Sequence, residues 1–246
     1  MRRSLVAGAL LAVVVATPAA AQVPLGSGFS VSGYVTGTTD YVTRGISQTR
    51  ERPALQAGAE LAHESGFYIG TFVSNVAFQG TDARQEVDAY LGYRWTLSGF
   101  RFDVVGQWYT YPGYTAGPGQ YGLDFAEVIL SAAYDFERVT LSGLVGWSPD
   151  YSFESGNAVR VEAGVAWTTP LWDIVLSGRV GYQSIDRNSR IGLPDYVYYG
   201  ASVSKALGGG VSVAAGVYGT DISKSDCFGG RDVCDTRLLA SVTWRF

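Results

Sequence analysis

The chain has 246 residues, 47% of them hydrophobic and 13% aromatic, with 32 glycines and a formal net charge of −4. The acidic balance argues against nucleic acid or an anionic surface as the main partner. A chain of this length, with a strand-like composition rich in glycine and aromatic residues, favours one β domain over several small ones.

The first residues predict a secretory signal peptide, because two arginines precede an apolar stretch at 5–15 and the small-residue site Ala19-Ala20-Ala21. The apolar stretch is too short to span a bilayer as a helix. No later stretch reaches the length of about eighteen apolar residues that a membrane helix needs. We therefore expect residues 1–21 to be removed after export and residues 22–246 to form an outer-membrane β-barrel domain.

Alternation of apolar and polar residues, interrupted by turn residues, predicts twelve strands in the mature chain. Val87 and Leu91, for example, point to the opposite face from Asp88. The segment 67–77 is apolar on both faces, so its orientation stays open. The predicted strands are 29–41, 53–63, 67–77, 85–96, 100–111, 123–135, 139–148, 158–167, 171–183, 195–206, 211–221 and 235–246.

The connections between these strands alternate between short and long without a break. An up-and-down antiparallel barrel places every second connection on the same side, and outer-membrane barrels keep periplasmic turns short and extracellular loops long. The fold class predicted is therefore all-β, a transmembrane up-and-down barrel of about twelve strands in the bacterial outer membrane. The short connections are 64–66, 97–99, 136–138, 168–170 and 207–210, and the long ones are 42–52, 78–84, 112–122, 149–157, 184–194 and 222–234.

Charged residues in the middle of the predicted strands fall on one face, which we assign to the lumen because a Lys or Arg facing lipid at mid-bilayer costs about 2–4 kcal/mol. Two interpretations remain open: the charges fill the wall as mutual pairs, or they line a hydrated pore that sets solute preference. A barrel of twelve strands is wider than the eight-stranded barrels that side chains fill, which favours a pore. The pore-lining candidates are Glu60, Glu86, Asp88, Arg94, Arg101, Asp103, Glu127, Arg160, Glu162, Asp173, Arg179 and Lys205.

Tryptophans lie near strand ends on the apolar face, as in the interfacial belts of membrane barrels, so outer-membrane lipid and lipopolysaccharide are expected partners. The last strand ends in an aromatic residue, Phe246, which we expect to be presented to the outer-membrane assembly machinery. The expected periplasmic belt contains Trp95, Trp167, Trp172 and Trp244, and the extracellular belt contains Trp108 and Trp147.

The most basic surface stretch is the first long connection, whose mouth-loop candidates are Arg44, Gln48, Arg50 and Arg52. It is either a solvated loop that counters lipopolysaccharide phosphates or a loop folded into the barrel mouth, where it contacts anionic or polar solutes.

The chain has only two cysteines and one histidine, which limits the metal sites and catalytic groups that it could contain. Cys227 and Cys234 would meet an oxidising compartment, which favours a disulfide, with free thiols or half of a metal site as the alternatives. No further His or Cys cluster completes a metal site, so neither a metal nor a cofactor is expected. His63 falls on the lipid-facing side beside a short turn, where we expect interfacial anchoring. A catalytic histidine is therefore not expected.

The segment from Asp40 through Arg44-Gly45 to Gln48, followed by Pro53-Ala-Leu-Gln56, resembles the amino-terminal hallmark of the TorF family of porin-like proteobacterial outer-membrane proteins. Further blocks occur in the same order, and the resemblance covers essentially the whole mature chain. It implies a small porin-like barrel. The additional blocks are 65–70, 86–93 and 109–112.

The predicted function is an outer-membrane porin-like channel for passive diffusion of small hydrophilic solutes or ions. One alternative is a non-conducting scaffold or surface-binding barrel. A weaker alternative is an outer-membrane enzyme that modifies lipid or protein. Both monomers and trimers are compatible with the sequence.

Overall fold

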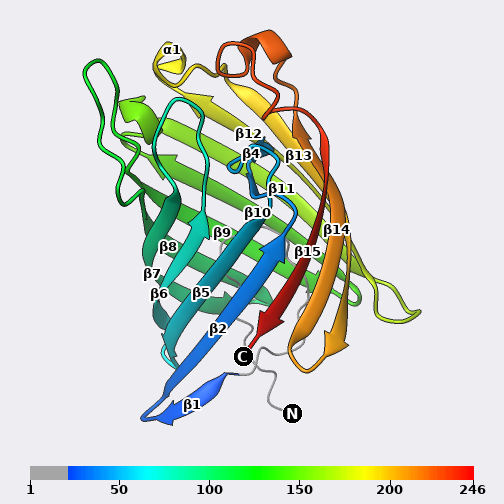
Figure 1. Ribbon diagram of the computed structural model, residues 1–246. Coiled ribbons are helices and arrows are strands. Elements are labelled where there is room, and N and C mark those ends of the chain that lie inside the picture. The colour runs from blue at the N-terminus through cyan, green and yellow to red at the C-terminus, as the bar shows by residue number, and fades with distance from the viewer. Residues whose placement is uncertain (1–21) are drawn as a thin grey trace.

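A computed structural model describes residues 22–246, so the predicted signal peptide, residues 1–21, lies outside the described residues. Twelve antiparallel strands form a closed, tilted barrel in which each strand pairs with its neighbours in sequence (Figure 1). The predicted all-β barrel of twelve strands is confirmed. The barrel strands are β2 (Phe29–Thr38), β5 (Ala54–His63), β6 (Phe67–Asn75), β7 (Gln85–Leu97), β8 (Phe100–Thr110), β9 (Phe125–Phe136), β10 (Val139–Ser148), β11 (Ala158–Thr168), β12 (Val175–Ile185), β13 (Tyr196–Gly208), β14 (Val211–Thr220) and β15 (Arg237–Arg245).

The remaining elements are short and are not among the twelve strands of the barrel wall. Among residues 22–246, no helix is long and apolar enough to cross a membrane. These elements are β1 (Val23–Gly26), β3 (Val42–Thr43), β4 (Ile46–Ser47), α1 (Asn188–Ile191) and the two 3-10 helices η1 (Ser152–Glu154) and η2 (Lys224–Asp226).

The barrel closes where β15 pairs with β2, from Ser241 opposite Thr38 to Arg245 opposite Tyr34. Phe246 extends this seam, because its backbone N–H and C=O both bond to Gly33. Beyond Phe246 the same edge of β2 pairs with β1, which forms a hairpin that projects past the barrel rim (Figure 1). Closure leaves no open edge among the twelve barrel strands, as a barrel in lipid requires.

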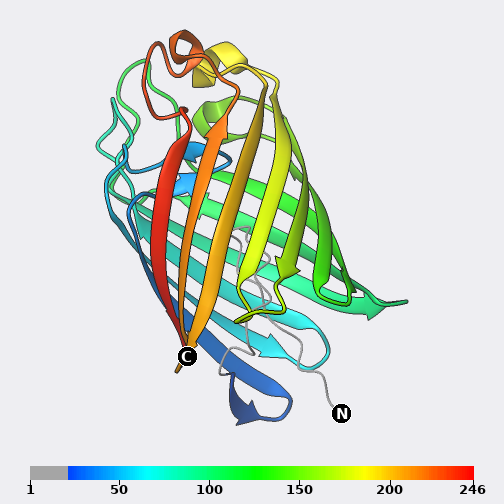
Figure 2. The same cartoon turned by 90° about the vertical axis from the view of Figure 1, so that its right-hand side faces the viewer.

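The two ends of the barrel differ in the length of their connections (Figure 2). Connections at the end that carries Phe246, the turn end, are short. One of them follows β13, where the consecutive residues Gly208, Gly209 and Gly210 have φ values of 92°, 59° and 79°. Glycine adopts such values without a side-chain clash. The long connections and all three short helices lie at the opposite end, the loop end. The predicted sorting of short and long connections is confirmed.

One strand begins later than its sequence indicates. The segment predicted from residue 171 onward starts as β12 only at Val175, because residues 169–174 form a turn closed by a 2.8 Å bond from the Thr169 N–H to the Ile174 carbonyl. Trp172 and Asp173 have φ values of 62° and 50° in this turn. Backbone in this conformation does not continue a β-ladder.

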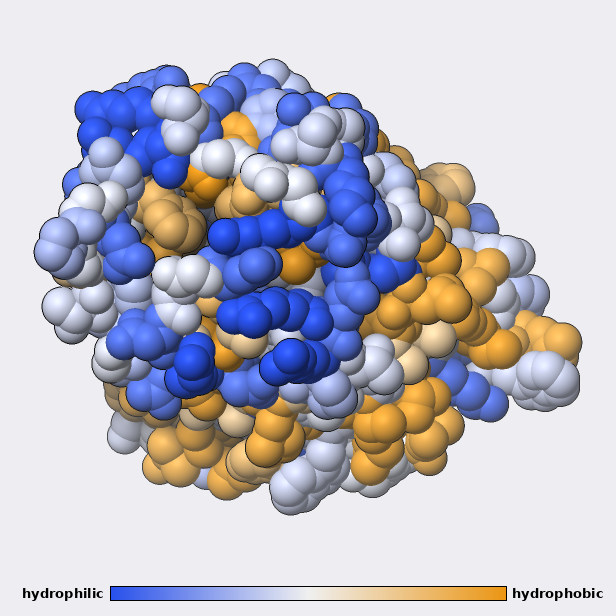
Figure 3. Space-filling view, turned by 45° about the horizontal axis from the view of Figure 1, so that its top comes forward, coloured by the Kyte–Doolittle hydropathy of each residue, from blue (hydrophilic) through white to orange (hydrophobic). Residues whose placement is uncertain are grey.

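Each strand has an apolar outer face and a mixed inner face. In β15, exposure alternates residue by residue, with Leu238, Val242 and Trp244 exposed on the outside. In β6, whose orientation the sequence left open, Tyr68 and Phe72 are buried inward and Ile69 is exposed. Viewed toward the loop end, the loops form a hydrophilic cap and the outer wall below them is largely hydrophobic (Figure 3).

Candidate functional site

The first long connection folds into the barrel as a small hairpin made of β3 and β4 (Figure 2). Its two-residue turn is Arg44-Gly45, with φ values of 49° and 78°, and two positive φ values are typical of the tight turns favoured in hairpins. A side chain at Gly45 would collide with the backbone carbonyl of Gly219 on β14. The hairpin turn therefore packs tightly against β14, two strands from β2 around the barrel. Of the two alternatives for this loop, the structure shows the one in which the loop is folded into the barrel mouth.

A buried carboxylate fixes the base of this hairpin. Asp40 accepts hydrogen bonds of 2.6 Å from Ser47 Oγ and 2.7 Å from Thr49 Oγ1 through one oxygen. Its other oxygen lies 3.4 Å from the guanidinium of Arg237 on β15. The Tyr41 N–H bonds to Thr49 Oγ1 at 3.1 Å. These contacts tie the hairpin to the seam of the barrel.

At the hairpin tip, Arg44 enters a buried ion network. Its Nη2 lies 2.8 Å from Glu127 Oε2 on β9, and its Nη1 donates to Tyr151 Oη at 2.8 Å and to Gln183 Oε1 on β12 at 3.3 Å. Arg160 on β11 donates to Glu127 Oε1 from Nε at 2.9 Å. Two guanidiniums thus share one buried carboxylate, an arrangement that offsets the cost of removing these charges from water. We call these five side chains the hairpin network.

A second ion network lies nearer the turn end and contains only strand residues. Arg94 makes a bidentate pair with Glu60, with N–O distances of 2.7 and 2.8 Å, and donates from Nε to Asp103 at 3.0 Å. Tyr68 Oη donates to Asp103 at 2.6 Å, and the Arg94 guanidinium lies 3.5 Å from the Tyr68 ring centroid. A bidentate pair between a guanidinium and a carboxylate combines the attraction of opposite charges with a fixed geometry. We call these four side chains the wall network.

Other inward charges also have partners. Tyr41 Oη donates to Glu86 at 2.6 Å, and Gln107 donates to Asp88 at 2.7 Å. Pairs also join Arg179 with Glu162 at 4.0 Å and Arg101 with Asp135. The pore-lining candidates whose strand positions face inward are Glu60, Glu86, Asp88, Arg94, Arg101, Asp103, Glu127, Arg160, Glu162 and Arg179.

Two pore-lining candidates occupy other positions. Asp173 lies in the turn before β12, with its side chain 81% exposed and paired with Arg138 at the turn end. Lys205 shares the outer face of β13 with Val203, because the inward positions of this strand are even-numbered. Its ammonium lies 5.9 Å from the Trp172 ring centroid. A lysine near a strand end can extend its charge to the membrane interface, so an outward position does not place the charge at mid-bilayer.

The loops enclose a cavity at the loop end, which we call the vestibule. It measures about 940 Å³, with open solvent at its mouth included. Of the mouth-loop candidates, Arg44, Gln48 and Arg50 line it, whereas Arg52 is exposed and not among the lining residues. The residues that line it come from the segments 41–50, 77–79, 109–111, 151–153, 191–196 and 228–233, together with Phe125 and with Glu86, which accepts a hydrogen bond from Tyr41 Oη.

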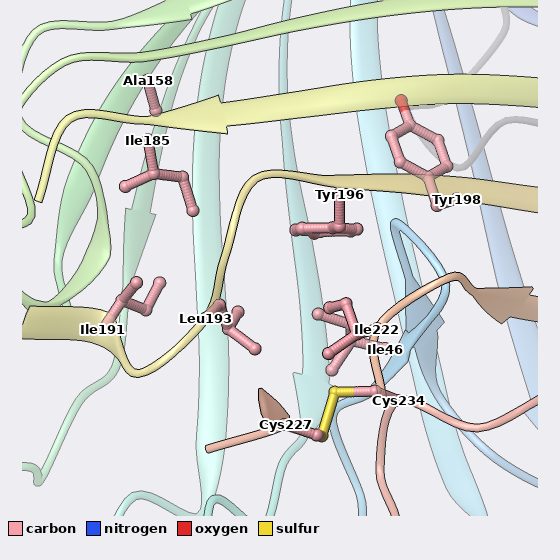
Figure 4. Packing of buried hydrophobic residues seen from close by; sticks show 10 residues of the cluster. All are labelled: Ile46, Ala158, Ile185, Ile191, Leu193, Tyr196, Tyr198, Ile222, Cys227 and Cys234. Carbon is pink, nitrogen blue, oxygen red and sulfur yellow. A yellow bond between two sulfur atoms is a disulfide. The ribbon is translucent and has the colours of Figure 1, made fainter. Parts of the chain in front are cut away.

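The predicted disulfide between Cys227 and Cys234 is present. Both cysteines are fully buried beside Ile46 of the hairpin and Ile222, so the disulfide belongs to the packed core of the loop end (Figure 4). At the other end, His63 packs against Phe29 at 4.6 Å between ring centroids and contacts Ser65 Oγ at 2.7 Å. Within residues 22–246, no three His, Cys, Asp or Glu side chains gather in a group that could hold a metal ion.

Sequence reasoning missed the tyrosine partners of the arginines and one cavity arginine. Tyr68 is an inward-facing residue of a barrel strand, so its parity would have indicated it once β6 was oriented. Tyr151 and Arg231 lie in loops, where no periodicity indicates the direction of a side chain. Only the packing of several loops shows that they contact the lumen and the vestibule.

A sequence profile of a bacterial family described as "Bacterial protein of unknown function (Gcw_chp)" matches residues 22–246. The chain belongs to the Gcw_chp family. The match spans all of the barrel and all of the loops that carry the hairpin and the disulfide. No curated protein matches this Gcw_chp sequence.

Solved structures similar to this Gcw_chp barrel include porins. The KdgM porin superposes with a TM-score of 0.56 at 10% identity, covering 87% of this chain and 99% of that one. The NanC porin gives a TM-score of 0.58 at 9% identity, with 86% and 98% covered. A further similar structure is the KdgM porin in complex with disordered oligogalacturonate, also with a TM-score of 0.56 and 10% identity and with 87% and 99% covered. At these identities the likeness establishes a porin-like barrel fold.

Proposed function

We propose that this Gcw_chp protein is an outer-membrane channel for passive diffusion of small hydrophilic solutes or ions. The turn end then faces the periplasm and the loop end faces the exterior. The apolar outer face, the closed wall and the porin-like fold support this proposal. The signal peptide proposed for residues 1–21 agrees with export. Within the family, the Arg44-Gly45 segment supports a closer relation to the TorF porins.

The observation that carries the proposal is the polar hairpin inside the barrel. Its tip places the Arg44 guanidinium against Glu127 and Gln183 of the opposite wall. A loop that is folded inward narrows the lumen, and the charged and amide groups around the narrowing favour hydrated solutes over apolar ones. Because acidic and basic groups both face the lumen, we expect weak selectivity between small anions and cations.

The outer surface suits lipid at both ends of the barrel. Trp108 and Trp147 are 51% and 46% exposed near the loop end, and Trp167 and Trp244 are 43% and 49% exposed near the turn end. We propose that they form the two interfacial belts, with lipopolysaccharide around the upper one. Phe246, which is 46% exposed beside the seam, is the residue we propose is presented to the assembly machinery.

Planar bilayers test the channel directly. Purified protein should give discrete conductance steps in concentrated KCl, and reversal potentials across a salt gradient should report the ion preference. The matched variant pair is Arg44→Gln, at the narrowing, and Arg52→Gln, on the outside of the same loop. We expect only the first to change the conductance. Persistent silence of folded wild-type protein at high salt would contradict the proposal.

A non-conducting scaffold or surface-binding barrel is the second candidate. The hairpin and wall networks favour it, because they show lumen charges held in mutual pairs. Electrical silence with an intact far-ultraviolet β spectrum would support this function over the channel. Enzymatic modification of lipid or protein has the least support. The only histidine, His63, lies at the turn end and packs against Phe29.

A further inference from the structure

The vestibule contains two arginines that do not form ion pairs. Arg50 Nε and Nη2 donate to the carbonyl oxygens of Ala77 and Phe78 at 2.8 and 3.2 Å. Arg231 Nη1 donates to the carbonyl of Gln79 at 2.9 Å. Among residues 22–246, no carboxylate lies within 4.0 Å of either guanidinium. Most arginines of the lumen, by contrast, pair with Asp or Glu.

The two guanidiniums bind three consecutive carbonyls of one loop segment, residues 77–79, so their charges are held close together. Partial burial and the positive charge of Arg50 lower the pKa of the Arg231 guanidinium. A guanidinium has five N–H donors, and each of these arginines uses only one or two of them on backbone oxygen. The remaining donors are the kind that bind a carboxylate through a bidentate fork. An anion between them would relieve the repulsion of the like charges.

Aromatic rings line the same cavity as the charged pair. They include Phe78, Tyr151, Phe153 and Phe228. Packed rings next to a few placed polar groups are typical of small-molecule sites. Planar ligands stack on such rings in offset or edge-to-face geometry.

Four residues that line the vestibule have strained backbones. Arg44, Arg50, Phe153 and Phe228 have φ values of 49°, 55°, 60° and 48°. A positive φ at a residue with a side chain costs about 1–3 kcal/mol, and such residues cluster at functional sites. Here the strained conformations belong to the residues that supply a guanidinium or a ring to the cavity.

The disulfide loop holds Arg231 and Phe228 over the vestibule. Cys227 and Cys234 close the loop that carries both residues. This loop is attached to the hairpin by a 2.9 Å bond from the Ser47 N–H to the Val233 carbonyl. A second bond of 2.9 Å joins the Phe228 N–H to the Gly192 carbonyl. The buried cysteines belong to the same hydrophobic cluster as Ile46 and Leu193 (Figure 4).

We infer that the vestibule is a binding site for small aromatic carboxylates, with Arg50 and Arg231 gripping the carboxylate and the surrounding phenylalanines packing on the ring. The inference rests on the proposed function at one point only: if the barrel is a channel, the bound solute would enter it from this site. Binding itself requires a folded barrel and no conduction.

Binding is tested by calorimetry or equilibrium dialysis on the folded full barrel in detergent, with benzoate as the probe. Benzamide keeps the ring without the charge, and acetate keeps the charge without the ring. We expect both to bind at least about tenfold more weakly than benzoate. Arg50→Gln and Arg231→Gln should each weaken benzoate binding about tenfold, because each removes a charge-assisted hydrogen bond. Arg52→Gln, with the same change in net charge on the same loop, should bind as the wild type does.

Several outcomes would overturn the inference. One is equal binding of benzoate and benzamide by the wild type, and another is unchanged affinity in Arg50→Gln and Arg231→Gln. If a glutamine variant fails to fold, Arg231→Lys replaces it, and loss of the fork with retention of charge should still weaken benzoate binding. A silent bilayer with normal benzoate binding would count against the channel and leave the site intact.

Discussion

The wall network and the hairpin network both bury arginine–carboxylate contacts inside one barrel, yet they are built differently. Every member of the wall network comes from adjacent strands, β5 to β8, so the barrel ladder fixes its geometry. The hairpin network joins three strand residues, Glu127, Arg160 and Gln183, to an arginine supplied by one loop and a tyrosine supplied by another. The first is therefore part of the barrel framework. The second is a contact that a loop can lose while the barrel remains closed.

Replacing Arg94 of the wall network should have the largest effect on the free energy of unfolding. Arg94→Gln leaves two carboxylates, Glu60 and Asp103, without their guanidinium, and breaking a buried pair costs about 3–5 kcal/mol. Urea unfolding of the barrel in lipid vesicles measures this loss. The control is Arg101→Gln, which removes a half-exposed arginine from its pair with Asp135 and should cost about 1 kcal/mol or less. A loss no greater than that of the control would refute the structural role of the wall network.

Replacing the hairpin arginine should have a smaller effect on stability and a larger one on conductance. In Arg44→Gln, Glu127 keeps its contacts with Arg160, so the expected loss in the free energy of unfolding is about 1–3 kcal/mol. Release of the hairpin tip should widen the narrowing and raise the single-channel conductance. If unfolding energy falls as far as in Arg94→Gln, or if conductance stays unchanged, the contrast between the two networks is wrong.

Removing the disulfide should act only on the loop end. The bond closes a short loop, for which chain entropy gives about 2–3 kcal/mol. In the double variant Cys227→Ser/Cys234→Ser we expect this loss to appear as local opening. Limited trypsin digestion should become faster at Arg231, while urea unfolding of the barrel changes little. Equal protection of the loop in oxidised and variant protein would show that loop packing alone holds it.

The smallest expected effect concerns Asp195, in the loop before β13. Burial opposes its ionisation, but hydrogen bonds from the Ile185 N–H, Asn188, Ser184 and Tyr182 outweigh this and keep the pKa of Asp195 below its usual value. Because the pKa of Asp195 is lower in the folded protein than in the unfolded chain, its ionised carboxylate stabilises the fold at any pH above the ordinary pKa of aspartate. This stabilisation is lost as the pH falls through the lower pKa of the folded protein. The protection of residues 186–195 against hydrogen exchange, measured relative to the intrinsic exchange rate at each pH, should therefore fall in acid. In Asp195→Asn this pH dependence should disappear.

The sequence predicted the barrel because lipid and strand geometry impose a period of two. Side chains alternate along a strand, and a charge facing lipid is costly, so the inward positions of residues such as Glu127 and Arg160 follow from parity. The same rule, applied with the wrong parity near the end of β13, placed Lys205 inside. The turn at Trp172 and Asp173 was missed, since an apolar turn has the composition of a strand.

The sequence by itself determined the number of strands, the alternating faces of most of them and the two kinds of ends, and it favoured a disulfide between the two cysteines. Tertiary structure alone decided that the first loop folds inward, that Arg44 reaches Glu127, and that Arg50 and Arg231 meet over one loop segment. These contacts join residues as far as 152 positions apart in sequence through loops without periodicity. Their geometry depends on how the loops pack on one another once the barrel has closed.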